Sequence, residues 1–316
     1  MIKYKIWALV CLLIVVFTSY YLYHTSTPEP AKPGYVKVDH GELFYQTFGE
    51  GEPVIVLHGG PGLDQGYLLP QMLELAKDHQ LIFYDQRGSG RSLGSPLNAK
   101  YINMNKFVED LDRLRNSLGL EKVVLLGHSW GARLAVNYVI KHQDHVSKLV
   151  LLSPSPMHAE GFAAFSKELN NRLLPIKDKT AAVFSYKDFK KLDANGIQQL
   201  YRDFFGVWFD DQSKNKDLSL NINVESARSG FMVLEQMFAN SPQPAAASIS
   251  PILAKITVPT LIIHGYQDAV PPSTAQDLKD MMPSASIVYL NHCGHFSYIE
   301  KPQETFSAIR AFLERH

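Results

Sequence analysis

The fold of this chain is decided by residues 122–131, Lys122-Val123-Val124-Leu125-Leu126-Gly127-His128-Ser129-Trp130-Gly131. An apolar run is followed by Gly-x-Ser-x-Gly and then by a helical pattern, which is the layout of a nucleophile elbow. So tight a turn needs glycines on both sides of Ser129, because a Cβ there would collide with the neighbouring strand and helix. The turn would raise the Ser129 hydroxyl to the N-terminus of the next helix, where negative charge is favoured. The alternative is a glycine-rich turn with an incidental serine.

The composition is that of an ordinary globular protein. The chain has 316 residues, of which 46% are hydrophobic and 20% are charged, so it can bury a large core. Its 31 basic and 31 acidic residues balance, which argues against a nucleic-acid surface. Because Cys11 lies in the N-terminal apolar segment, Cys293 has no partner expected in the folded domain. Nothing in the sequence indicates a metal or an organic cofactor, and oligomeric state is not indicated either.

The N-terminus predicts a membrane anchor. An uncharged run of 18 residues extends from Ile6 to Tyr23, after Lys3 and Lys5. As a helix it would span about 27 Å, enough to cross most of a bilayer core. Bulky tyrosines stand where a cleavage site would need small residues, so we expect an uncleaved single-pass anchor with an extracytoplasmic catalytic domain. The alternatives are a secreted or periplasmic protein after signal cleavage and, less favoured, a lipoprotein through Cys11.

The rest of the chain predicts an α/β fold. The proline-rich stretch 24–34 reads as a tether, so 1–34 forms the anchor and its spacer. A hairpin is expected at 35–48, and short apolar runs alternate with helical patterns after it, which favours a parallel sheet covered by helices on both faces. The expected strands after the hairpin are 53–57, 81–84, 123–126, 148–152, 260–264 and 286–290. The expected helices are 67–77, 104–118, 130–141, 273–281 and 302–315.

The alternation stops between Pro154 and Pro251. This stretch has no clear buried strand and is rich in helix-compatible residues. We expect a helical lid at 154–251, inserted into a core formed by 35–153 and 252–316. Such an insertion would lie over the carboxyl ends of the strands, where open α/β sheets bind their ligands.

Two further side chains fit a nucleophilic serine. Serine needs a base, and the base needs a group that orients it. Asp268 follows the expected strand 260–264, and His295 follows 286–290, so both would lie at the same sheet edge as Ser129. His292 is the competing histidine, and a turn or helix-cap role is the alternative for Asp268.

An oxyanion hole is predicted on the loop after the strand 53–57, which reads His58-Gly59-Gly60-Pro61-Gly62. Consecutive glycines let backbone N–H groups face a substrate without side chains in the way. We expect the N–H groups of Gly60 and Trp130 to hold the oxyanion and Gly59 to line the substrate site. The alternative is an ordinary Gly/Pro loop.

Three motifs together resemble the proline iminopeptidase branch of the α/β-hydrolase superfamily. They are 58–62, the elbow 127–131, and Tyr84-Asp85-Gln86-Arg87-Gly88-Ser89-Gly90-Arg91-Ser92. The resemblance implies the α/β-hydrolase fold, with a mostly parallel eight-stranded sheet. It also implies release of an N-terminal residue, often proline, from short peptides through an acyl-enzyme on Ser129, with His295 as base and Asp268 as its partner. Asp85 and Arg87 would brace the turn beneath the site.

An aminopeptidase must also bind the substrate ammonium, which members of this branch do with lid carboxylates. Glu225 is the best candidate here and Glu235 the next, and for each the alternative is an exposed helix face. A carboxylesterase or lactonase that uses the same triad on small acyl esters is the alternative activity. A hydrolase fold reused as a binding module is disfavoured because no triad residue is missing.

Overall fold

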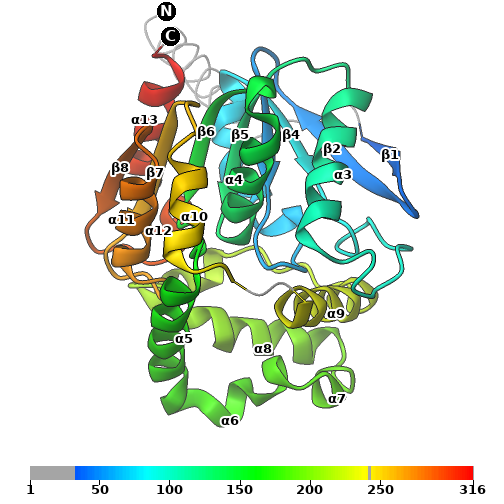
Figure 1. Ribbon diagram of the computed structural model, residues 1–316. Helices are drawn as coiled ribbons and strands as arrows, with labels where there is room; N and C mark the ends of the chain where they lie inside the picture. Colours follow the sequence, from blue (N-terminus) through cyan, green and yellow to red (C-terminus); the bar gives the residue numbers. More distant parts are fainter. Residues whose placement is uncertain (1–32, 241–242, 316) are drawn as a thin grey trace, which may run out of the picture.

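The computed structural model describes residues 33–240 and 243–315, which form an eight-stranded sheet covered by helices (Figure 1). The strand order is β1-β2-β4-β3-β5-β6-β7-β8, with antiparallel pairing of β1 with β2 and of β2 with β4 and parallel pairing elsewhere. The predicted mostly parallel sheet of eight strands is therefore confirmed. The strands are β1 (Gly34–Val38), β2 (Gly41–Phe48), β3 (Pro53–Leu57), β4 (Gln80–Tyr84), β5 (Val123–His128), β6 (Val146–Leu152), β7 (Thr260–Gly265) and β8 (Ala285–Leu290).

Helices cover both faces of the sheet, as expected from strands that are apolar on both sides. Successive residues of one strand enter two different cores, so that Leu125 belongs to one and Leu126 to the other. The first core is closed by α3 (Met104–Ser117), α4 (Trp130–His142), α10 (Ala246–Leu253) and α11 (Pro272–Met281). The second is closed by α2 (Leu69–Met72), η2 (Leu73–Lys77), α12 (Ser297–Glu300) and α13 (Pro302–Leu313).

One expected helix is broken into pieces. Instead of a single helix over 67–77, the chain forms η1 (Gln65–Tyr67), α2 and η2, with Pro70 in the first turn of α2. Asp64 caps η1 by accepting a hydrogen bond from the N–H of Gly66. These short turns bring Tyr67 under the loop that follows β3, where its hydroxyl meets Gly59.

The insertion between β6 and β7 is helical, and its helices gather beyond one end of the sheet (Figure 1). It has a small core of its own, which includes Phe189, Ile197 and Phe231. The boundaries 35–153, 154–251 and 252–316 stay a prediction, and 1–34 lies almost wholly outside the described residues. The elements are α5 (Ala159–Leu173), η4 (Leu174–Ile176), α6 (Lys177–Thr180), η5 (Ala181–Phe184), α7 (Tyr186–Phe189), α8 (Ala194–Gly206), η6 (Gln212–Asp217) and α9 (Val224–Asn240).

The membrane anchor needs a correction. Within 33–240 and 243–315, every helix is too short or too polar to cross a bilayer. The predicted span from Ile6 to Tyr23 lies outside the described residues. The prediction of a single-pass membrane protein with an extracytoplasmic domain rested on the apolar run, its flanking lysines and the bulky tyrosines at its end, and we do not retain it.

The elbow is as tight as its sequence requires. Ser129 has φ 57° and ψ −118°, and its N–H donates to the carbonyl of Leu152 at the end of β6. Gly131 passes so close to β3 that a Cβ would lie 2.2 Å from the carbonyl oxygen of Leu57. The start of α4 therefore lies in close contact with the ends of β3 and β6.

We expect Gly131→Ala to lower the free energy of unfolding by about 3 kcal/mol, because backbone rather than a mobile side chain occupies the space. Denaturant unfolding would measure the change. Gly206→Ala is the control, since the added Cβ would lie 3.3 Å from the amide nitrogen of Asn215, at the end of a side chain that can adjust. Equal stabilities of the two variants would contradict this account of the elbow.

Candidate active site

Asp268 and His295 form a buried pair at the carboxyl ends of β7 and β8. His295 Nδ1 lies 2.9 Å from both carboxylate oxygens of Asp268, and the residues are 3% and 1% exposed. Burial opposes ionisation of Asp268, but the charge and hydrogen bond of His295 and the N–H of Val270 together lower its pKa. An ionised carboxylate can only accept, so Nδ1 carries the proton. When the ring carries this one proton, Nε2 is left to accept another.

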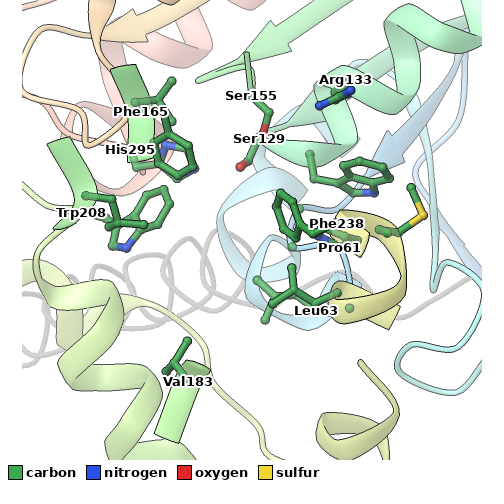
Figure 2. Close-up of a pocket in the computed structure, with 18 of the residues that line it drawn as sticks. Pro61, Leu63, Ser129, Arg133, Ser155, Phe165, Val183, Trp208, Phe238 and His295 are labelled. Carbon is green, nitrogen blue, oxygen red and sulfur yellow. The ribbon is translucent and has the colours of Figure 1, made fainter. Parts of the chain in front are cut away.

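Ser129 and His295 line the same cavity, and in Figure 2 the Ser129 hydroxyl points toward the side where His295 lies. No hydrogen bond joins this hydroxyl to His295 among the described residues. The competing residue His292 is far more exposed, with 83% of its side chain accessible, and its ring faces Asp210 on the surface. The tertiary structure thus brings Ser129, Asp268 and His295 together and leaves His292 outside.

The candidate oxyanion groups also face this cavity, which is lined by Gly60 and Trp130. Trp130 is the first residue of α4, so its N–H has no acceptor within the helix. Gly60 has φ +119°, a conformation that side chains rarely allow. The N–H of Gly59 donates instead to the hydroxyl of Tyr67 at 2.7 Å, so Gly59 can line the cavity but offers the substrate no free N–H.

A chain of neutral hydrogen bonds joins three loops of the site. The Tyr67 hydroxyl lies 2.7 Å from His128 Nδ1, and His128 Nε2 lies 3.0 Å from the carbonyl oxygen of His295. Because a carbonyl only accepts, Nε2 carries the proton of His128, and Nδ1 accepts from Tyr67. Burial, with the charge of His295, lowers the pKa of His128 from 6.5 to about 3. The ring therefore stays neutral and positions the loops after β3, β5 and β8.

The turn after β4 braces the same loops from below. Gln86 donates from its backbone to His58 Nε2 and accepts from the indole of Trp130 at 3.0 Å. Asp85 accepts from the backbone N–H groups of Gln65 and Arg91. The structure thus supports the bracing role expected of this turn, and the neighbouring Arg87 forms a buried ion pair with Asp110 at 2.8 Å.

Lid residues directly contact the loops that carry Asp268 and His295. The backbone carbonyl of Trp208 accepts from the N–H of His295 at 2.8 Å, and the two rings lie 4.7 Å apart. Arg172 of α5 donates to the carbonyl of Asp268 at 3.0 Å. Glu300, which is buried, accepts from Gly294 at 2.7 Å and from Asp210 at 2.9 Å. Isolated polar residues of this kind carry no sequence motif, so the sequence did not reveal them.

The cavity has a volume of about 580 Å³ and is walled mainly by aromatic side chains of the lid. None of the described residues that line it is Asp, Glu or Lys. Glu225 and Glu235 are both exposed on α9 and are absent from the lining. Neither predicted carboxylate therefore lines the cavity in which a substrate ammonium would bind. The aromatic lining comprises Tyr67, Trp130, Phe162, Phe165, Phe184, Phe189, Tyr201, Phe204, Phe205, Trp208, Phe231, Phe238 and Phe296.

Comparison with known proteins agrees with this geometry. The family described as the alpha/beta hydrolase fold matches residues 52–302. A proline iminopeptidase of Heyndrickxia coagulans is 30% identical over 301 residues, covering 89% of this chain and 98% of the relative. The chain belongs to the proline iminopeptidase branch of the α/β-hydrolase superfamily.

Solved structures share the fold of this chain. The crystal structure of a proline iminopeptidase from Mycobacterium smegmatis has a TM-score of 0.67 and 21% identity, covering 90% of this chain and 98% of that one. Est816, described as an N-acyl homoserine lactone degrading enzyme, has a TM-score of 0.64 and 24% identity, covering 88% and 100%. The fold is thus shared by proteins that carry different activities.

We expect acid to destabilise the protein partly through His128. The folded pKa of about 3 lies below the ordinary value of 6.5, so unfolding takes up a proton between these pH values. The contribution of neutral His128 to stability is present in full above pH 6.5 and is lost as the pH falls toward 3. His128→Asn should therefore lose less unfolding free energy between pH 7.5 and pH 5 than the wild type does.

Denaturant unfolding at the two pH values measures this difference. His292→Asn is the matched control, because His292 is exposed and should leave the pH dependence unchanged. Parallel pH curves for wild type and His128→Asn would contradict the neutral, buried state of His128.

Proposed function

We propose that this chain is a serine hydrolase in which Ser129 attacks a substrate carbonyl and forms an acyl-enzyme. His295 accepts the serine proton at Nε2 and later gives it to the leaving group, while Asp268 orients the ring and stabilises its charged form. The N–H groups of Gly60 and Trp130 hold the oxyanion. The observation that carries the proposal is the buried Asp268–His295 hydrogen bond beside the strained Ser129 elbow.

The cavity favours an ester with an apolar acyl group as the substrate. Aromatic side chains surround Ser129, and burying an alkyl chain among them contributes about 0.8 kcal/mol for each methylene group. A free ammonium would be desolvated in the same cavity without an acidic side chain among the described lining residues, which is costly. We therefore place carboxylic esters with an aliphatic or aromatic acyl group ahead of peptides.

Aminopeptidase activity is the second candidate, supported by the relatives named proline iminopeptidase. Its ammonium would have to reach Asp64, which lines a small cavity that shares Tyr67 and Tyr201 with the large one. Burial and the charge of Asp85 raise the pKa of Asp64 to about 6, so this carboxylate is still mostly ionised at neutral pH.

We expect Ser129→Ala and His295→Ala each to lower kcat by about 10,000-fold or more, as losses of a nucleophile or its base do. Ser129→Ala should melt close to wild type, whereas His295→Ala should melt at a lower temperature because it leaves the buried carboxylate of Asp268 without its partner. Hydrolysis of 4-nitrophenyl hexanoate, followed by release of the dye, is the measurement. His292→Ala should retain wild-type turnover, and a His292→Ala variant as impaired as His295→Ala would overturn the assignment of the base.

Substrate class is tested with two anilides that share one leaving group. Hexanoyl 4-nitroanilide carries a neutral apolar acyl group, and prolyl 4-nitroanilide carries a free ammonium. We expect kcat/KM for the hexanoyl compound to be about 100-fold higher, the cost of leaving a charged group unpaired in the cavity. Faster release from the prolyl compound, abolished by Asp64→Asn, would establish the aminopeptidase instead.

A further inference from the structure

Arg133 is a buried cation of the candidate active site, and none of the described residues gives it a counter-charge. It is 7% exposed and lines the cavity that contains Ser129. No carboxylate among the described residues forms an ion pair with it, and its Nε has no hydrogen-bond partner there. Its other nitrogens donate only to uncharged acceptors, the carbonyl of Pro156 and the side chain of Gln243. Burying an unpaired guanidinium in this way costs desolvation free energy.

The position of Arg133 ties it to the reacting serine. It follows Ser129 by four residues along α4, so it lies on the same helix face about 6 Å further along the axis. Helical side chains lean toward the N-terminus, which directs the long Arg133 chain back toward the cavity. Figure 2 shows Arg133 and His295 on opposite sides of Ser129. The ring of Phe162 from the lid lies 4.9 Å from its guanidinium carbon.

The surroundings give Arg133 a polar corner in an otherwise aromatic wall. Asn137 and Ser155 line the cavity as well, and Asn137 donates to the backbone carbonyl of Arg133. Burial lowers the pKa of Arg133 to about 10, which still leaves it charged at neutral pH. Its positive charge therefore lies near the reacting serine, in a cavity with no acidic lining side chain among the described residues.

We propose that Arg133 binds an anionic group of the substrate, a carboxylate or a phosphate ester, while the apolar part of the same molecule packs against the aromatic wall. The guanidinium presents planar donors that match both anions, and the unpartnered Nε would complete this contact. The inference extends the proposed ester hydrolysis to esters that carry a negative charge close to the scissile bond. It is opposite in sign to the ammonium recognition of an aminopeptidase.

Binding tests the inference without any need for catalysis. Benzoate and benzamide have nearly the same shape and differ in charge, so isothermal titration of the full chain with each isolates the anion. We expect benzoate to bind about tenfold more tightly than benzamide in the wild type, as charge-assisted hydrogen bonds do. The preference should disappear in Arg133→Gln and persist in part in Arg133→Lys. Arg113→Gln, which removes an exposed arginine of α3, is the matched control and should keep it.

A comparison of phenyl phosphate with benzoate distinguishes a phosphate ester from a carboxylate as the bound anion. Tighter binding of phenyl phosphate than of benzoate assigns a phosphate ester, and the reverse order assigns a carboxylate. Equal binding of benzoate and benzamide by the wild type would overturn the inference, as would a preference that survives in Arg133→Gln. Because these are equilibrium measurements, they stand even if the chain hydrolyses no ester.

Kinetics relate the site to the reaction. Mono-4-nitrophenyl glutarate and 4-nitrophenyl pentanoate share chain length and leaving group, and only the first carries a carboxylate. We expect the ratio of their kcat/KM values to fall about tenfold in Arg133→Gln. A fall in both values together, with a lower melting temperature, would show that Arg133 only braces Pro156 and Gln243. Hydrolysis of neither ester by the wild type would instead refute the proposed function.

Discussion

The structure depends on the close approach of α4 to the end of β3. A Cβ on Gly131 would lie 2.2 Å from the carbonyl oxygen of Leu57, so only glycine lets the helix begin there. That approach leaves Ser129 in its strained turn, with its N–H bonded to Leu152 and its side chain in the cavity. The positions of Ser129 and of the loop after β3 are therefore set by the backbone. Groups held in this way need little reorganisation during a reaction.

A second constraint is a network of neutral hydrogen bonds that fixes the surrounding loops relative to one another. The hydrogen bonds run from Gly59 to Tyr67, then to His128, and on to the carbonyl of His295. Every member of this chain is neutral, since burial lowers the pKa of His128 and raises that of Tyr67. Buried neutral partners avoid the large desolvation cost of ions, and satisfied networks of this kind make a site rigid. The network itself therefore adds no charge beside the buried carboxylate of Asp268.

The lining of the cavity, and not family membership, indicates which substrates fit this chain. The family match over residues 52–302 and the similar proline iminopeptidase place the chain in its branch, and the cavity of this chain has an aromatic wall. A site with Arg133 and no acidic lining residue among those described repels an ammonium and attracts an anion. Activity is therefore argued from the lining and not from the fold.

The sequence by itself determined the sheet, the elbow and the loops that carry Asp268 and His295, because apolar strands and strained glycine turns are local patterns. It did not predict the broken helix at 67–77 or the network through Tyr67 and His128. The apolar run, its flanking lysines and the tyrosines at its end also led to the membrane anchor, which we do not retain. Only the tertiary structure decided that Glu225 faces outward and that Arg133 has no counter-charge among the described residues. Which side chain faces which depends on how the lid helices rotate and pack, and that is set by contacts between residues far apart in the chain.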